Sequence, residues 1–199
     1  MRRIVFRSEH YRRYYFEAHA QLREGALNQF SPECGPWTNM CMSQHRRCTA
    51  NYFLGDESFE FVRKANRQMA VVALMLFLTS IAGCVGTLEQ SLTSSMHKAP
   101  PMRTVLAYIG ATRITTSHGA FGGSTTKLLQ LFSSSKVLLK MMKRATPKRR
   151  SMTTLVSRRD GKFTGKAKAM KNSQHHTAAY GLAFAEAFMV QRDALLHGI

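Results

Sequence analysis

The chain has 199 residues, enough for one ordinary domain and too few for a chain of several. It carries 29 Lys and Arg against 11 Asp and Glu, a formal net charge of +18, and no acid occurs from Gln90 to Arg159. A folded surface normally mixes both signs, because a field of one sign repels itself. The composition therefore predicts a polyanionic partner, either nucleic acid or an anionic membrane lipid, with a solvated basic tail as the alternative.

Residues 1–67 form a basic, aromatic-rich N-terminal region. Its longest early apolar run is Ile4-Val5-Phe6, too short for the hydrophobic core of a secretory signal. Arginines among aromatic residues resemble a mitochondrial targeting helix, but such peptides are poor in acids and this one contains Glu9 and Glu17. The pattern favours a basic surface helix.

Three cysteines and a histidine follow in PECGPWTNMCMSQHRRC, namely Cys34, Cys41, His45 and Cys48. Compact zinc sites usually begin with two cysteines separated by two to four residues, so that one turn presents both. Here the first gap is six residues. We therefore predict no metal site and no cofactor here. Free thiols are the favoured interpretation, and a disulfide in an oxidising compartment is the alternative.

Residues 68–88, QMAVVALMLFLTSIAGCVGTL, contain no charge. A helix of about 20 residues spans the hydrocarbon core of a bilayer. An ordinary surface helix shows a polar residue every third or fourth position, and none appears from Met69 to Leu78. The run predicts a transmembrane helix, with a buried core helix as the alternative. The expected fold class is mostly α-helical, with one transmembrane helix, amphipathic helices and a partly disordered basic region.

Small residues in this run indicate a surface for a neighbouring membrane helix. Ala82 and Gly86 are four residues apart, a spacing that lets two helix backbones approach closely. We expect a helix–helix partner there and a membrane localisation, with the mitochondrial inner membrane among the candidates. The flanking charges do not decide the orientation, because Arg63 and Lys64 favour an inward N-terminus and the basic C-terminal region favours the opposite.

Residues 89–126 are predicted as a Gly/Ser/Thr-rich linker with a short strand over residues 104–116. The stretch HGAFGGSTTK at 118–127 resembles a phosphate-binding loop, but Lys127 comes four residues too late. We interpret it as a flexible loop before a helix, with Ser124 or Thr125 as the N-cap.

Residues 127–173 are predicted as a basic amphipathic helix followed by a polybasic tract. In TTKLLQLFSSSKVLLKMMKR, leucines recur at three- and four-residue steps on one face and lysines lie on another. Such a helix lies on an anionic membrane, docks into a partner's groove or packs on an ordinary core. The residues expected to bind an anionic surface are Lys136, Lys140, Lys143, Arg144, Lys148, Arg149, Arg150, Arg158 and Arg159.

Residues 174–199 close the chain with an amphipathic helix expected from about Thr177 to Leu196. Tyr180, Phe184 and Phe188 fall on one stripe of it. The charges of Glu186 and Asp193 argue against a second membrane span.

No set of side chains indicates catalysis. Asp56, Glu57 and Glu60 cluster where acids complement the dipole of a helix start. We therefore predict a non-enzymatic, single-pass membrane protein that acts in anchoring or assembly, with no small-molecule substrate. The alternatives are a soluble RNA-binding or ribosome-associated component in which residues 68–88 form a core helix, a metal-assisted enzyme built on the Cys and His cluster, and a weakly selected reading frame without a defined activity.

Overall fold

The computed structural model describes residues 24–39, 44–125, 127–144, 156–159, 162–165 and 176–197. The chain divides into two compact units. Unit 1 takes residues 1–112 and 132–135, and unit 2 takes residues 113–131 and 136–199.

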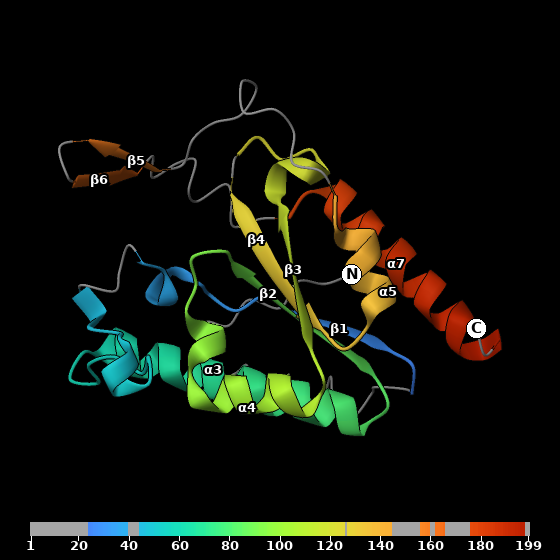
Figure 1. The fold of residues 1–199 in the computed structure, drawn as a ribbon, viewed down its shortest axis with the longest axis horizontal. Coiled ribbons are helices and arrows are strands. Elements are labelled where there is room, and N and C mark those ends of the chain that lie inside the picture. The colour runs from blue at the N-terminus through green and yellow to red at the C-terminus, as the bar shows by residue number, and fades with distance from the viewer. Residues whose placement is uncertain are drawn as a thin grey trace. The chain divides into compact units, whose positions relative to one another are not determined.

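Unit 1 is built on a parallel pair of strands with helices packed against it (Figure 1). Leu27 lies opposite Val85 and Phe30 opposite Leu88 in this pair. A parallel pair needs a long crossover, and the helix α3 lies within it. The elements of this part of the chain are β1 (Leu27–Phe30), η1 (Gly35–Trp37), η2 (Thr49–Asn51), α3 (Glu60–Ile81), β2 (Val85–Ser91), η3 (Met96–Lys98) and α4 (Pro100–Tyr108).

The helix α3 supplies much of the core of unit 1. Its first turn contains Glu60, an acid at the positive end of the helix dipole. It ends at Ile81, and Gly83 adopts the left-handed backbone conformation, with φ +66°, that turns the chain toward β2. Its buried face consists of Val62, Ala65, Asn66, Met69, Val72, Ala73, Met75, Leu76 and Thr79.

The helix α4 packs beside α3 on the same core (Figure 1). Pro100 and Pro101 open it, where proline's fixed φ suits a helix and no amide is lost. Met102 and Leu106, one turn apart, are buried. The ring centroids of Phe77 in α3 and Tyr108 in α4 are 5.0 Å apart, so the two helices are also in contact through this aromatic pair.

The remaining strands and helices belong chiefly to unit 2. They are β3 (Thr112–Ser117), η4 (His118–Phe121), β4 (Leu128–Ser133), α5 (Lys136–Met142), β5 (Val156–Arg159), β6 (Lys162–Gly165) and α7 (Ala178–His197). The four-stranded sheet has the order β1-β2-β4-β3, and β5 pairs antiparallel with β6 in a separate sheet. The closing helix predicted over Thr177–Leu196 is present as α7.

The predicted fold class, mostly α-helical with a transmembrane helix, is wrong. The protein is mixed α/β with a four-stranded sheet. Residues 68–88 are not one element, because α3 ends at Ile81 and Val85 begins β2. Within the described residues, no helix has both the length and the apolar character needed to cross a bilayer. The long uncharged run arises because the apolar end of a helix is followed, after a three-residue turn, by a buried strand.

The same turn removes the predicted helix–helix motif. Ala82 is the C-cap of α3 and Gly86 lies in β2, so the two residues share no helical face. Gly86 has a different structural role. A Cβ at this position would lie 2.9 Å from Leu76 Cδ2, so the glycine permits the close approach of α3 to the strand.

Two further predicted elements differ from the structure. In place of one strand, residues 104–116 contain the end of α4 and most of β3. The helix predicted after the glycine loop is two elements, the buried strand β4 and the short helix α5. Ser124 and Thr125 therefore cap no helix. A short, largely apolar run such as LLQLFS is ambiguous, because it fits a buried strand and a segment of a buried helix alike.

Candidate polyanion-binding surface

The helix α5 presents its basic residues to solvent because its apolar residues pack inward. Leu138, Leu139 and Met142 are buried. The helix lies alongside α7 (Figure 1), whose Tyr180, Phe184 and other residues are also buried. Three- and four-residue spacing places the buried residues of α5 on one face, which fixes the rotation of this short helix.

The opposite face carries the lysines predicted to bind an anionic surface. Lys136, Lys140 and Lys143 follow at steps of four and three residues, and all are exposed, as is Arg144. Within the part of the chain that the structure describes, none of the three lysine side chains forms an ion pair or a hydrogen bond. The structure thus brings four of the nine predicted residues together as a cationic surface that we call the α5 surface.

An aromatic cluster contacts the α5 surface at its Arg144 end. The guanidinium of Arg144 lies over the ring of Phe121, 5.0 Å from its centroid. Phe121 meets Tyr180 edge to face at 5.0 Å. The Thr177 hydroxyl donates to the carbonyl of Phe121 and accepts from the amide of Tyr180, so it caps α7 while tying the helix to η4. A cation–π contact restrains Arg144 without neutralising it.

The glycine loop before β4 is organised around a buried histidine. His118 Nδ1 lies 3.3 Å from Thr125 Oγ1, and the amide of His118 donates to the carbonyl of Lys127. A Cβ at Gly123 would collide with the imidazole of His118. The helix predicted directly after this loop is wrong, because the strand β4 follows it. The loop wraps a side chain and leads into a strand, and the sequence offered no sign of this.

Five of the predicted residues have no described side chain. Lys148, Arg149 and Arg150 lie outside the described residues. Arg158 and Arg159 end strand β5, and only their backbone is described. Their assignment to an anionic surface therefore stays a prediction from the sequence.

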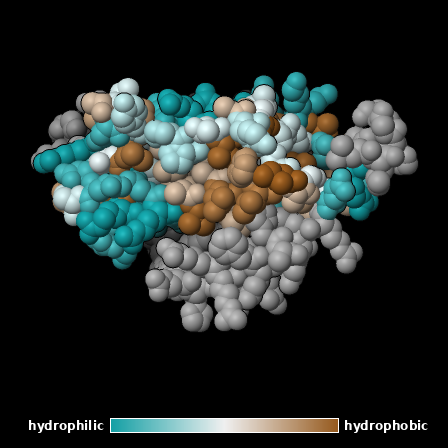
Figure 2. Space-filling view, turned by 90° about the horizontal axis from the view of Figure 1, so that it is seen from below, coloured by the Kyte–Doolittle hydropathy of each residue, from teal (hydrophilic) through white to brown (hydrophobic). Residues whose placement is uncertain are grey.

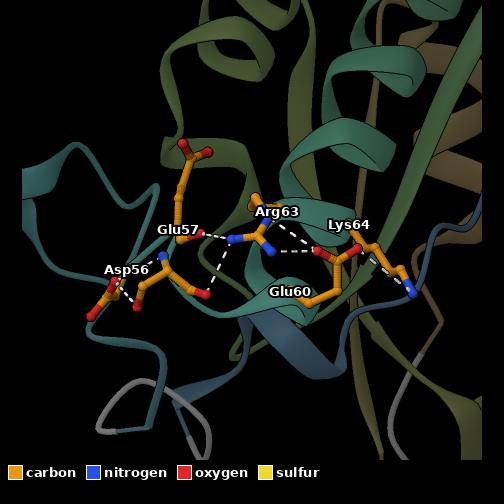
Figure 3. Close-up of polar contacts among 6 residues, drawn as sticks. Asp56, Glu57, Glu60, Arg63 and Lys64 are labelled. Atoms are coloured by element: carbon orange, nitrogen blue, oxygen red, sulfur yellow. Dashed lines mark hydrogen bonds and ion pairs between the residues drawn. The ribbon is translucent and has the colours of Figure 1, made fainter.

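The acids at the start of α3 give unit 1 a different charge arrangement (Figure 3). Arg46 pairs with Asp56 at 3.1 Å, and Arg63 Nε donates to Glu60 Oε2 at 3.0 Å. Lys64 lies 3.8 Å from the same carboxylate of Glu60. Hydrogen bonds from Ser58, and to a lesser extent the charge of Arg46, lower the pKa of Asp56. The hydrogen bond from Arg63 lowers the pKa of Glu60.

Arg47 is a buried cation that the sequence did not reveal. Its guanidinium lies 3.7 Å from the Trp37 ring centroid and donates to the carbonyls of Pro36, Phe53 and Leu54 and to Asn66 Oδ1, all at 2.7–2.9 Å. Burial lowers the pKa of Arg47 to about 10, against the opposing charge of Glu57. The residue is thus still cationic at neutral pH. Its partners are dispersed through the sequence, so no local motif could have identified it.

The cysteine and histidine cluster does not assemble in the described residues. Cys34 is half-buried and Cys48 is exposed, and both are free thiols. His45 is buried, with Nδ1 2.9 Å from the carbonyl of Pro36. Cys41 lies outside the described residues. Among those that are described, no group of three His, Cys, Asp or Glu side chains could hold a metal ion.

Comparison of the chain with protein-family models, with curated proteins and with solved structures finds no match. The α5 surface and the charge distribution of the chain are the features that bear on its function.

Proposed function

We propose that the protein binds nucleic acid through the α5 surface and the basic tract that follows it, and that it acts as a binding protein without catalytic activity. The observation that carries the proposal is the exposure of Lys136, Lys140 and Lys143 without a carboxylate partner among the described residues. Residues 136–171 hold thirteen Lys and Arg against one acid, Asp160. Phosphate oxygens are the complementary ligands for such a surface.

The proposed binding is not selective for base sequence. Base readout requires side chains that reach base edges or stack on bases. The tract from 136 to 171 contains one aromatic residue, Phe163. Lysine binds phosphate as a point charge without a fixed orientation. Affinity should therefore follow the density of phosphates and the salt concentration.

The test is a salt titration of the full chain with labelled single-stranded RNA. The variant Lys136→Gln/Lys140→Gln/Lys143→Gln should bind more weakly. Each phosphate that a lysine no longer neutralises reduces the slope of log affinity against log salt by about 0.7 on single strands. Replacement of all three lysines should therefore reduce the slope by about 2. RNAs of unrelated sequence should respond alike.

The matched control changes three exposed cations of unit 1, Lys64→Gln/Arg67→Gln/Arg103→Gln, and removes the same net charge. This control should leave the slope close to that of the unmodified protein. Equal effects of both triple variants would show that total charge, and not the α5 surface, determines binding. Binding to anionic vesicles but not to RNA at matched salt would identify lipid as the polyanion and overturn the proposal.

A further inference from the structure

One face of α3 is apolar and exposed in its second half. Leu74 is 46% exposed and Ile81 is 61% exposed, and both are large hydrophobic residues. Phe77 and Leu78 lie between them and are half-buried. With Tyr108 of α4, which is 63% exposed and contacts Phe77, they form what we call the α3 apolar face. Figure 2 shows hydrophobic residues gathered on this side of the molecule.

The face has the spacing of a helix-docking stripe. Leu74, Phe77, Leu78 and Ile81 stand at positions i, i+3, i+4 and i+7, so their side chains follow one another along the same side of α3. Their neighbours Met75, Leu76 and Thr79 face the core and are buried. The helix therefore has apolar residues on both sides. A helix that only covers a core is polar on its outer side. The core accounts for Leu78, which packs against it, but not for the exposed Leu74 and Ile81.

Positive charge borders one end of this stripe. Arg67 lies two helical turns before Leu74 on the same side of α3, and it is exposed. Arg63 and Lys64 form ion pairs with Glu60, whereas Arg67 forms no ion pair with a described residue, and its charge acts on Glu60 less than theirs do. From Phe61 to Leu88 the sequence contains no acid, and neither does α4. A ligand complementary to this face would therefore present an apolar stripe with acidic residues at one end.

The geometry points to an amphipathic helix of a partner protein, with acidic residues at one end of its apolar stripe, as the ligand of the α3 apolar face. Docking of such a helix would bury Leu74, Ile81 and Tyr108 and pair its acids with Arg67. A second copy of this chain is a poorer complement, because each copy carries a net charge of +18 and would place Arg67 near like charges. A helix that lies on an anionic bilayer carries cations along its whole polar side. On α3 the cations lie beyond one end of the apolar stripe only, so a bilayer is also a poorer complement.

The probe is a labelled synthetic amphipathic helix of about 20 residues, which covers the length of α3. It carries leucines along one side and three glutamates at one end. Two further peptides serve for comparison, one with the same composition in scrambled order and one with lysines in place of the glutamates. Binding to the full chain is measured by fluorescence anisotropy. The scrambled peptide has the same charge, so it reports any non-specific attraction to the basic tract.

The acidic amphipathic peptide should bind more tightly than the scrambled one, and Leu74→Ser/Ile81→Ser should weaken it about tenfold or more. Both side chains are exposed, so circular dichroism should show an unchanged fold. The control is Leu182→Ser on α7, a leucine that at 65% is at least as exposed as Leu74 and Ile81, and this variant should not change binding. The variant Arg67→Glu should reverse the preference in favour of the lysine peptide, and Arg103→Glu should not.

Equal binding of the ordered and scrambled peptides would overturn the inference. So would unchanged binding in the double serine variant. Sedimentation of the unmodified protein as a dimer that Leu74→Ser/Ile81→Ser dissociates would assign the face to a second copy. Binding to anionic vesicles that the same variant abolishes, in the absence of peptide selectivity, would assign it to a membrane surface.

Discussion

The cations at the start of α3 and those along α5 differ in what surrounds them. Arg63 and Lys64 share the carboxylate of Glu60, and Arg46 pairs with Asp56. Lys136, Lys140 and Lys143 have no such partner among the described residues. The number of basic residues is similar in the two places, so the count of cations does not identify a binding surface. The position of the acids does, because a cation already paired offers less attraction to a phosphate.

Arg47 differs from both groups of cations, because it is buried and its hydrogen bonds stabilise the fold. We expect Arg47→Ala to lower the free energy of unfolding by about 3 to 5 kcal/mol, because the carbonyls of Pro36 and Phe53 and the amide of Asn66 would lose a charged donor. Urea denaturation measures the change. The control Lys140→Ala removes an exposed cation and should stay within about 0.5 kcal/mol. Similar losses in both variants would remove the distinction between structural and available cations.

The comparison also requires α3 to be a core helix, and two leucines on it test this. Leu76 is fully buried and Leu74 is exposed. Leu76→Ala should cost about 2 to 4 kcal/mol, because it leaves a cavity between α3 and β2. Leu74→Ala should cost less than about 0.5 kcal/mol. If the two variants were equally destabilised, the outer side of α3 would be packed and the α3 apolar face would not be available to a partner.

Some of this arrangement could be predicted from the sequence. Glu60 indicated the start of α3, and the aromatic spacing from Tyr180 indicated α7. The exposure of Lys136 and Lys140 could be predicted from the leucines between them. When one face of an amphipathic helix packs on a core, the opposite face is exposed to solvent.

The rest depends on contacts between distant residues. The turn at Gly83 divides the uncharged run, but a glycine within an apolar segment also occurs in membrane helices. The apolar outer side of α3 made the run look like a membrane span, although it lies on the surface of unit 1. Arg47 could not be assigned because Pro36 and Asn66 come together only in the folded chain.

A third experiment converts α5 into a helix charged like α3. Lys136→Glu places an acid four residues before Lys140, the same spacing as Glu60 and Lys64. The new acid removes one cation and pairs another, so the salt slope on single-stranded RNA should fall by about 1.4, against about 0.7 for Lys136→Gln. Equal slopes for the two variants would show that Lys140 does not contact phosphate. The reciprocal variant Glu60→Gln frees Arg63 and Lys64 and should raise RNA binding slightly.

The smallest expected effect concerns the pH dependence of the paired acids. The pKa values of Asp56 and Glu60 are lowered from their ordinary 3.8 and 4.5 by hydrogen bonds from Ser58 and Arg63. A carboxyl whose folded pKa lies below its unfolded pKa contributes stability that is present above the unfolded value and is lost as pH falls through the folded one. The thermal midpoint should therefore fall as the pH is lowered below 4.5.

In Asp56→Asn/Glu60→Gln this part of the fall should be absent, so the midpoints of variant and unmodified protein should converge at low pH. The Glu60 side chain is exposed and that of Asp56 is partly exposed, so solvent screens both contacts and the difference at neutral pH should be small. Identical pH profiles would show that the contacts in Figure 3 do not stabilise the start of α3, and its cations would then be as available to phosphate as those of α5.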